Sequence, residues 1–293
     1  MEITCVGDFR LGFGESLVWD EQRNRLYFVD CAARALHWLD DDDDHLHTYL
    51  PKSMPIGLAL TTAGTLVAVL DDGLHEIDAD ARTSQLITAF PEAMGGRGND
   101  ICADLHGNLI TGKLNTGKLN TGPGEGSAWW YSAARGWRLV DADIGNTNGP
   151  GVAVLAGEMT LIIGDTSAQY FAYPYEPATG AVGDRRVFGD TTGLHGLPDG
   201  TTFDAEEGLW CALMHGGQLA RFTTAGLDRT VALPVKNPTD VTFGGPGLDR
   251  LYVVSVGSRR AAEPRGGGLD GALLVIDGLD VIGRPEPRAR LTG

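Results

Sequence analysis

The sequence has few positive charges. It contains 23 Lys and Arg residues against 39 Asp and Glu residues, which gives a formal net charge of −16 over 293 residues. A surface of this sign repels nucleic acid and anionic membranes, so neither is an expected partner. The charge still permits a small or cationic ligand.

Cysteines and long apolar runs are also scarce. The four cysteines, Cys5, Cys31, Cys102 and Cys211, are far apart and form no C-x-x-C pair, so we expect small apolar residues in strands, without structural zinc or disulfides. No apolar segment approaches the roughly 18 residues of a membrane span. The first residues, MEITCVGDF, lack the basic start and apolar stretch of a signal peptide. A soluble protein in a reducing, cytoplasmic setting is therefore expected.

Long amphipathic helical patterns are absent, whereas glycine is abundant, with 42 residues. Six segments share one rhythm, in which a turn is followed by a leucine that opens an alternating strand. These segments are RNRLYFVD, AGTLVAVL, HGNLITGK, GEMTLIIG, EEGLWCAL and LDRLYVVS. Their marker leucines are Leu26, Leu66, Leu109, Leu161, Leu209 and Leu251, with successive spacings of 40, 43, 52, 48 and 42 residues.

Repeats of this length with several strands each are typical of propeller blades. One four-stranded sheet cannot bury both faces alone, whereas six packed radially bury them against each other and leave an axial channel. We therefore predict an all-β fold, a six-bladed β-propeller with a central channel, formed by residues 1–293 as one domain. The first residues are expected to complete the last blade. An all-β sandwich or a two-domain chain is the alternative.

Polar side chains recur about ten residues before the marker leucines, at the start of the preceding strand. They are Glu15, Asn99, Asn148, Asp199 and Asp240, and only the second unit has none. In a propeller these strands are innermost, so we expect the five side chains to surround one small space at one end of the channel. Crowded carboxylates repel each other, and a bound divalent cation removes that repulsion. Oxygen ligands without Cys or His suit Ca²⁺, Mg²⁺ or Mn²⁺.

These polar residues also have simpler interpretations. Asn or Asp before Gly is a common turn former, and Asp240 could cap a loop by accepting hydrogen bonds from its own backbone. Asp20, Asp104 and Asp204, which end the same strands, are expected in turns toward the far end of the propeller.

Two local features are irregular. The aspartate run from 40 to 44 could attract a cation, but it lacks the glycine and bidentate glutamate of an EF-hand loop, so a solvated hairpin tip is favoured. The tandem TGKLN repeat from 111 to 120 is either a slipped duplication that lengthens a loop or a lid over the channel mouth. Loops tolerate insertions, which favours the first alternative. Lys113 and Lys118 in this repeat are expected to be solvated, although both could reach the mouth.

At these residues the sequence resembles the family of metal-dependent lactonases that includes senescence marker protein, regucalcin and gluconolactonase. The resemblance covers almost the whole chain. It rests on GESLVWDEQRNRLYFVD, GRGNDICADLHGNLITG, NTNGPGVAV, GDTSAQYFAYPYEPATG, LPDGTTFDAEEGLWCAL and VTFGGPGLDRLYVVS, taken together and in this order.

The resemblance implies a six-bladed propeller with one divalent cation in its channel. Glu15, Asn148 and Asp199 match the metal ligands of the family, and Asp199 also matches its proposed general base. Arg97 matches an arginine that holds substrate oxygens, and Asn99 matches a residue beside the metal. Calcium is the expected ion, with magnesium, manganese, zinc and iron(II) as alternatives.

The chain departs from the family pattern at three places. Ser16 and Leu17 stand where the family has Gly-Pro after its first ligand, and Gly98 replaces an aromatic residue between Arg97 and Asn99. An acidic residue that some members place after the third marker strand has no secure match in the TGKLN repeat. The metal ligands are therefore expected to be intact and the substrate pocket to be altered.

The predicted activity is hydrolysis of an aldonolactone or similar small sugar lactone, a small-molecule substrate. Asp199 would take the proton of the attacking water, and Arg97 would orient ring hydroxyls. His195 is expected to line the pocket, with an ordinary loop histidine as the alternative. A serine nucleophile is not indicated, because no G-x-S-x-G motif is present. Two alternatives are a metal-dependent hydrolase of another ester, such as a phosphotriester, and a non-catalytic calcium-binding propeller.

Overall fold

The computed structural model describes residues 1–292 with gaps at 42, 44, 115–123 and 258–267. Most of the TGKLN repeat, including Lys118, and part of the aspartate run lie outside the described residues. In the described part, no helix is long and apolar enough to cross a membrane.

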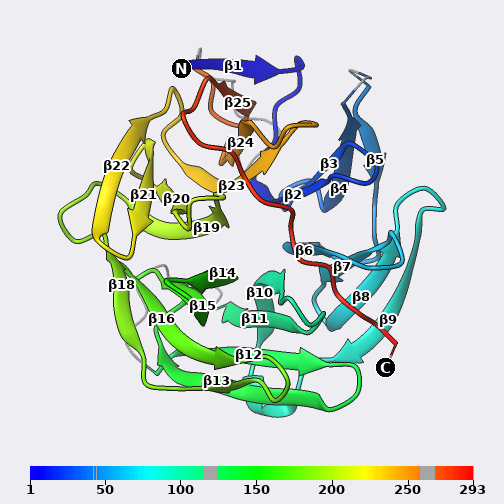
Figure 1. The fold of residues 1–293 in the computed structure, drawn as a ribbon. Coiled ribbons are helices and arrows are strands. Elements are labelled where there is room, and N and C mark those ends of the chain that lie inside the picture. The colour runs from blue at the N-terminus through cyan, green and yellow to red at the C-terminus, as the bar shows by residue number, and fades with distance from the viewer. Residues whose placement is uncertain (42, 44, 115–123, 258–267, 293) are drawn as a thin grey trace.

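Six antiparallel sheets are arranged around a common axis, which confirms the predicted six-bladed propeller (Figure 1). The first blade contains β2 (Gly14–Asp20), β3 (Arg25–Asp30), β4 (Ala35–Asp40) and β5 (His47–Tyr49). The second contains β6 (Gly57–Leu60), β7 (Leu66–Val69), β8 (Gly73–Asp78) and β9 (Thr83–Ala89). The 3-10 turn η1 (Glu92–Met94) leads to the third blade, with β10 (Arg97–Ala103), β11 (Leu109–Leu114), β12 (Gly126–Ser132) and β13 (Gly136–Ile144).

The fourth blade has an outer edge divided between two short strands. It contains β14 (Thr147–Leu155), β15 (Glu158–Asp165) and β16 (Gln169–Glu176), and β16 pairs with both β17 (Ala181–Val182) and β18 (Arg186–Asp190). The fifth blade contains β19 (Leu197–Phe203), β20 (Leu209–Met214), β21 (Gln218–Thr223) and β22 (Gly226–Ala232). The sixth contains β23 (Pro238–Gly244), β24 (Arg250–Ser255), β25 (Leu273–Asp277) and β1 (Glu2–Val6).

The N-terminal strand closes the ring. β1 pairs antiparallel with β25, with Ile3 opposite Ile276, so the first residues complete the last blade as predicted. This pairing places the first and the last strand of the chain in one sheet.

Each marker leucine lies in the second strand of its blade and is almost fully buried. The second strands are covered on both faces by neighbouring blades, so apolar residues recur along them. The core consists of such clusters between blades, as where Val69 of the second blade and Ile101 of the third belong to one cluster.

The six first strands, β2, β6, β10, β14, β19 and β23, contact each other in order around the axis. Near the start of five of them, the pairing with the second strand shifts in register. The shifts lie between Glu15 and Val18, Gly98 and Ile101, Asn148 and Gly151, Pro198 and Thr201, and Pro238 and Asp240. Such bulges redirect side chains. Only β6, in the unit without a polar residue at this point, pairs without a shift.

The segment after β25 crosses the propeller at the end where the inner strands finish (Figure 1). Its backbone bonds to several blades, as in Ala289 N to Leu60 O, Arg290 N to Gly107 O and Ala205 N to Ile282 O. The repeat pattern did not predict this crossing segment. The crossing segment covers one end of the axis, whereas the starts of the inner strands lie at the other end.

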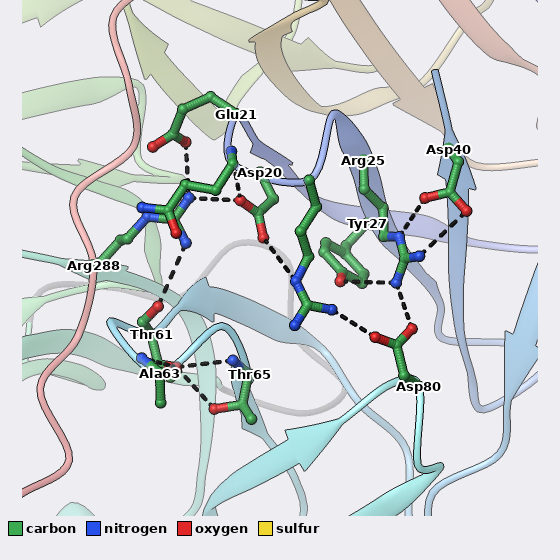
Figure 2. A network of polar contacts seen from close by, with 12 residues as sticks. Asp20, Glu21, Arg25, Tyr27, Asp40, Thr61, Ala63, Thr65, Asp80 and Arg288 are labelled. Carbon is green, nitrogen blue, oxygen red and sulfur yellow. Dashed lines mark hydrogen bonds and ion pairs between the residues drawn. The ribbon is translucent and has the colours of Figure 1, made fainter. Parts of the chain in front are cut away.

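Asp20, Asp104 and Asp204 lie at this covered end, as predicted, at the points where the inner strands pass into turns. Each accepts a hydrogen bond from the backbone nitrogen two residues later. Asp20 also receives Arg288 of the crossing segment at 2.6 Å, and Arg25 lies between Asp40 and Asp80 of two neighbouring blades (Figure 2).

Candidate metal and substrate site

Side-chain amides connect three neighbouring blades at the starts of their inner strands. Asn99 Nδ2 donates to Thr147 O at 2.8 Å and to Asn148 Oδ1 at 2.5 Å. Asn148 Nδ2 donates to Pro198 O at 3.1 Å, directly before Asp199. Both asparagine side chains are buried, so these bonds hold β10, β14 and β19 in a fixed relation.

Asp199 lies in the bulge of β19, so the simpler interpretation of this residue as a turn former before Gly200 is wrong. The Tyr170 hydroxyl of the fourth blade donates to Asp199 O and accepts from Asp199 N, both at 3.1 Å. Gly200 is required because a Cβ there would collide with the Asp240 carboxylate. Tyr170 lies in β16, the third strand of the fourth blade, and its hydroxyl holds the backbone of Asp199. The sequence pattern did not indicate this residue.

Glu15 places a buried carboxylate in the same region. Its Oε2 atom is fully buried and has no hydrogen-bond partner among the described residues. Burial, and then the nearby Asp199, Asp100 and Asp240, raises the pKa of the Glu15 carboxyl well above its usual range. Burial, and then Asp100 and Asp240, likewise raises the pKa of Asp199. These two carboxylates therefore require a proton or a cation to balance them.

Asp100 and Asp240 lie next to these residues but are bonded to the backbone. Asp100 Oδ2 accepts from Gly149 N at 2.8 Å, and burial raises the pKa of Asp100 to about 6. Asp240 accepts from Leu17 N of the first blade and from its own neighbour Val241 N. Asp240 lies within β23 and not in a loop, although its carboxylate does accept a hydrogen bond from the neighbouring backbone, as its simpler interpretation expected. The bond from Leu17 N also links the last blade to the first.

A cavity of about 60 Å³ lies between Asp100 and Asp240 and the crossing segment. It is lined by Asp100 and Asp240 and by Arg284 and Glu286 of the crossing segment. The candidate metal ligands do not line it, whereas the residues that follow them do. The cavity is therefore separate from the space at the strand starts.

Arg97 begins β10 and points its guanidinium group at Asp71, with 2.9 Å between Nη1 and Oδ1. Its Nε and Nη2 atoms are buried and have no partner among the described residues. Glu15 and Arg97 both act on the buried Cys31 thiol, whose pKa is raised chiefly by burial, then by Glu15, and lowered by Arg97. The two residues therefore lie in one neighbourhood.

Glu15 and Arg97 together account for three of the six partnerless buried side-chain polar atoms in the described residues. Buried polar groups in proteins are normally hydrogen-bonded, so a cluster of exceptions calls for a ligand. The carboxylate oxygen needs a cation, and the guanidinium nitrogens need acceptor oxygens. The donor set fits a hard divalent cation that shares its site with an oxygen-rich molecule.

The candidate ligand set is poor in acidic groups. Among the described residues, no group of three or more His, Cys, Asp or Glu side chains is arranged to hold a metal ion. Glu15 and Asp199 supply two carboxylates, and the third candidate ligand is the amide oxygen of Asn148. Amide oxygens are accepted ligands of calcium, so this composition remains compatible with a hard cation.

His195 lies in the loop before β19, and its side chain is exposed. Its carbonyl oxygen accepts a hydrogen bond from Gln218 Nε2 at 2.9 Å. Within the described part of the chain, no hydrogen bond joins its imidazole to the candidate ligands, so its pocket role stays a prediction. All four cysteines are free thiols, with Cys31 and Cys211 buried and Cys5 exposed.

The fold and site define a class: six-bladed propellers with buried carboxylate and amide groups at the starts of their inner strands. Residues 13–257 match the family model described as the SMP-30/gluconolactonase/LRE-like region. The chain belongs to this family, which confirms the resemblance seen in the sequence.

Individual relatives cover almost the whole chain. Pentonolactonase XacC of Haloferax volcanii is 30% identical, with 99% of this chain and 98% of the relative covered. The 6-deoxy-6-sulfogluconolactonase of Pseudomonas putida is 29% identical, with 89% of each chain covered. Among solved structures, the calcium-binding protein regucalcin from Agrobacterium tumefaciens has a TM-score of 0.84 at 25% identity, with 98% of this chain and 96% of that chain covered.

Proposed function

We propose that this chain hydrolyses small sugar lactones with the help of one divalent cation held by Glu15, Asn148 and Asp199. The observation that carries the proposal is the Glu15 Oε2 atom, which has no partner among the described residues, near a second buried carboxylate and the Arg97 donors that likewise have none there. The names of two relatives, a pentonolactonase and a sulfogluconolactonase, support a lactone as substrate. Calcium is the proposed ion, in keeping with the name of the regucalcin structure.

A bound divalent cation would supply positive charge where a carbonyl oxygen becomes negative during ester hydrolysis. Asp199 is the proposed general base, which removes a proton from the attacking water at its carboxylate. Tyr170 fixes the backbone of Asp199 on both sides, so the carboxylate stays in place through turnover. A pre-positioned base lowers the reorganisation that the reaction requires.

Substrate hydroxyls are the proposed partners of Arg97 and Asn99. Arg97 offers Nε and Nη2 as donors, whereas both amide hydrogens of Asn99 are used by Thr147 and Asn148. Asn99 is therefore expected to meet a ligand through its amide oxygen. Together they provide donors and an acceptor for a polyhydroxylated ring.

The test is a panel of sugar lactones followed with a pH indicator, with and without chelator. Asp199→Asn is expected to reduce kcat by at least about 100-fold while the fold is retained, since general acid–base groups contribute about 10²–10⁴-fold. Asp190→Asn, at an exposed position of β18, is the matched control and should retain full activity. Wild-type rates in folded Asp199→Asn, or activity that survives complete metal removal, would reject this mechanism.

The same ligand set also suits a calcium-binding propeller without catalysis, and the regucalcin structure carries that description in its name. Tight calcium binding with no turnover of any lactone would favour this second function. Turnover of a phosphotriester in the absence of lactone hydrolysis would indicate a different ester as substrate.

A further inference from the structure

The second blade lacks a polar residue in its inner strand, yet it reaches the site through a turn. Asp71 lies in the tight turn between β7 and β8, which Leu70 N closes by donating to Gly73 O. Val69 at the end of β7 pairs with Gly57 at the start of β6, so this turn lies at the end where the inner strands start. From there the Asp71 carboxylate contacts Arg97 of the third blade.

The Asp71–Arg97 contact uses only part of each group. Oδ1 of Asp71 binds Nη1 of Arg97 at 2.9 Å, while Nε and Nη2 of Arg97 stay free among the described residues. The Arg97 side chain is 16% exposed, whereas that of Asp71 is 53% exposed. The pair therefore presents two buried donors beside an accessible carboxylate.

Among the described residues, no charged side chain other than Arg97 pairs with Asp71. Lys52, the basic residue near this turn, binds Asp72 at 2.8 Å, and His75 binds the other oxygen of Asp72 at 2.7 Å. The backbone nitrogen of Asp71 donates a hydrogen bond to Ser53 Oγ at 3.3 Å, which leaves the Asp71 carboxylate untouched. Its charge is balanced by Arg97 among the described residues.

We propose that Asp71 positions Arg97 and makes the site select neutral polyhydroxylated lactones over lactones that carry an anionic substituent. This inference rests on the proposed function of the same site. A hydroxyl group both accepts from the Arg97 donors and donates to the Asp71 carboxylate. A fully ionised sulfate or phosphate group can accept only, and it meets the negative charge of Asp71 beside the arginine.

Asp71→Asn keeps the size of the side chain and removes its charge. Asp72→Asn is the matched control, because Asp72 is the next residue, is similarly exposed and binds Lys52 and His75 instead of Arg97. Binding of sorbitol and of sorbitol 6-sulfate to the cation-loaded protein is measured by calorimetry. These probes differ in one anionic group and are not hydrolysed, so the readout does not depend on turnover.

The unaltered protein is expected to bind sorbitol more tightly than its sulfate ester. Asp71→Asn should shift the ratio of the two affinities toward the ester by about 3- to 5-fold, the size of an exposed charge interaction, while Asp72→Asn should leave it unchanged. Thermal unfolding of both variants should match the unaltered protein, because both side chains are solvent-exposed. An unchanged ratio in Asp71→Asn, an equal shift in Asp72→Asn, or an unaltered protein that binds the ester better or neither probe would overturn the inference.

A kinetic experiment separates this inference from the proposed function. For gluconolactone and its 6-sulfate, Asp71→Asn should change the ratio of KM values in the same direction with little change in kcat. If neither lactone is opened by the unaltered protein but the binding ratio still shifts, the lactonase proposal fails and the role of Asp71 stands. If both lactones are opened and the ratio does not move, the reverse holds.

Discussion

The ring of Phe90 lies against Gly98, where an added Cβ would come within 2.8 Å of the ring's Cζ atom. Phe90 follows the last strand of the second blade and also packs on Trp137, with 6.0 Å between the ring centroids. The position between Arg97 and Asn99, where an aromatic residue is expected from the family pattern, is thus filled by a ring from another segment.

Gly98→Phe should be destabilising, because its side chain would collide with Phe90 and with Val69 Cγ1, which lies 2.7 Å from the added Cβ. Overpacking of this kind costs about 1–3 kcal/mol, and displacement of Arg97 should raise KM for a lactone. The double change Gly98→Phe with Phe90→Ala should recover part of both losses. Thermal unfolding and steady-state kinetics measure the two effects, and a single variant as stable as the parent would show that the space is not filled.

Tyr170→Phe should weaken the site without removing any candidate ligand. The hydroxyl satisfies both backbone groups of buried Asp199, so its loss leaves a donor and an acceptor unpaired, at a cost of about 1–3 kcal/mol in unfolding free energy. We expect kcat to fall more than KM rises, because Asp199 loses its fixed orientation. A variant with unchanged kcat at full cation loading would remove the positioning role of Tyr170.

Without a cation, the protein should lose stability as pH rises. The pKa values of Glu15, Asp199 and Asp240 are raised in the folded state, and that of Asp100 is raised to about 6. The folded state therefore binds more protons than the unfolded chain. The associated stability is complete below the usual carboxyl range, about pH 4, and is lost as pH rises through about 6 and beyond.

Cation binding should show the opposite dependence, because the ligands must be deprotonated. Thermal unfolding in chelator and in saturating calcium, compared at about pH 5 and about pH 7.5, measures both trends. The increment in Tm from calcium should grow with pH, and calorimetry in two buffers should detect proton release on binding. An increment that is equal at both pH values would contradict the assignment of Glu15 and Asp199 as ligands.

The sequence predicted the repeated part of this structure and not the contacts between repeats. The marker leucines and the inner-strand polar residues recur at similar offsets because each blade meets its neighbours in the same way. Tyr170 and Asp71 reach the site from a third strand and from a turn of another blade. No offset within one repeat identifies such residues, because their positions depend on how neighbouring blades pack.

Asp240 shows how the offset can mislead. In β23 the register shift spans Pro238 to Asp240, whereas in the other four strands it spans three residues, as from Pro198 to Thr201. A difference of one residue reverses the direction of a side chain in a strand. Asp240 accordingly bonds to backbone nitrogens, including that of Leu17, although its sequence offset matches that of Glu15.

The central claim is that oxygens from three blades hold one cation on the axis. It is tested most directly by a crystal structure of the protein soaked with Mn²⁺, with anomalous difference maps at the manganese edge. We expect one strong axial peak within about 2.6 Å of carboxylate oxygens of Glu15 and Asp199 and of Asn148 Oδ1. A peak elsewhere, or none at these three residues at full soaking concentration, would contradict the account.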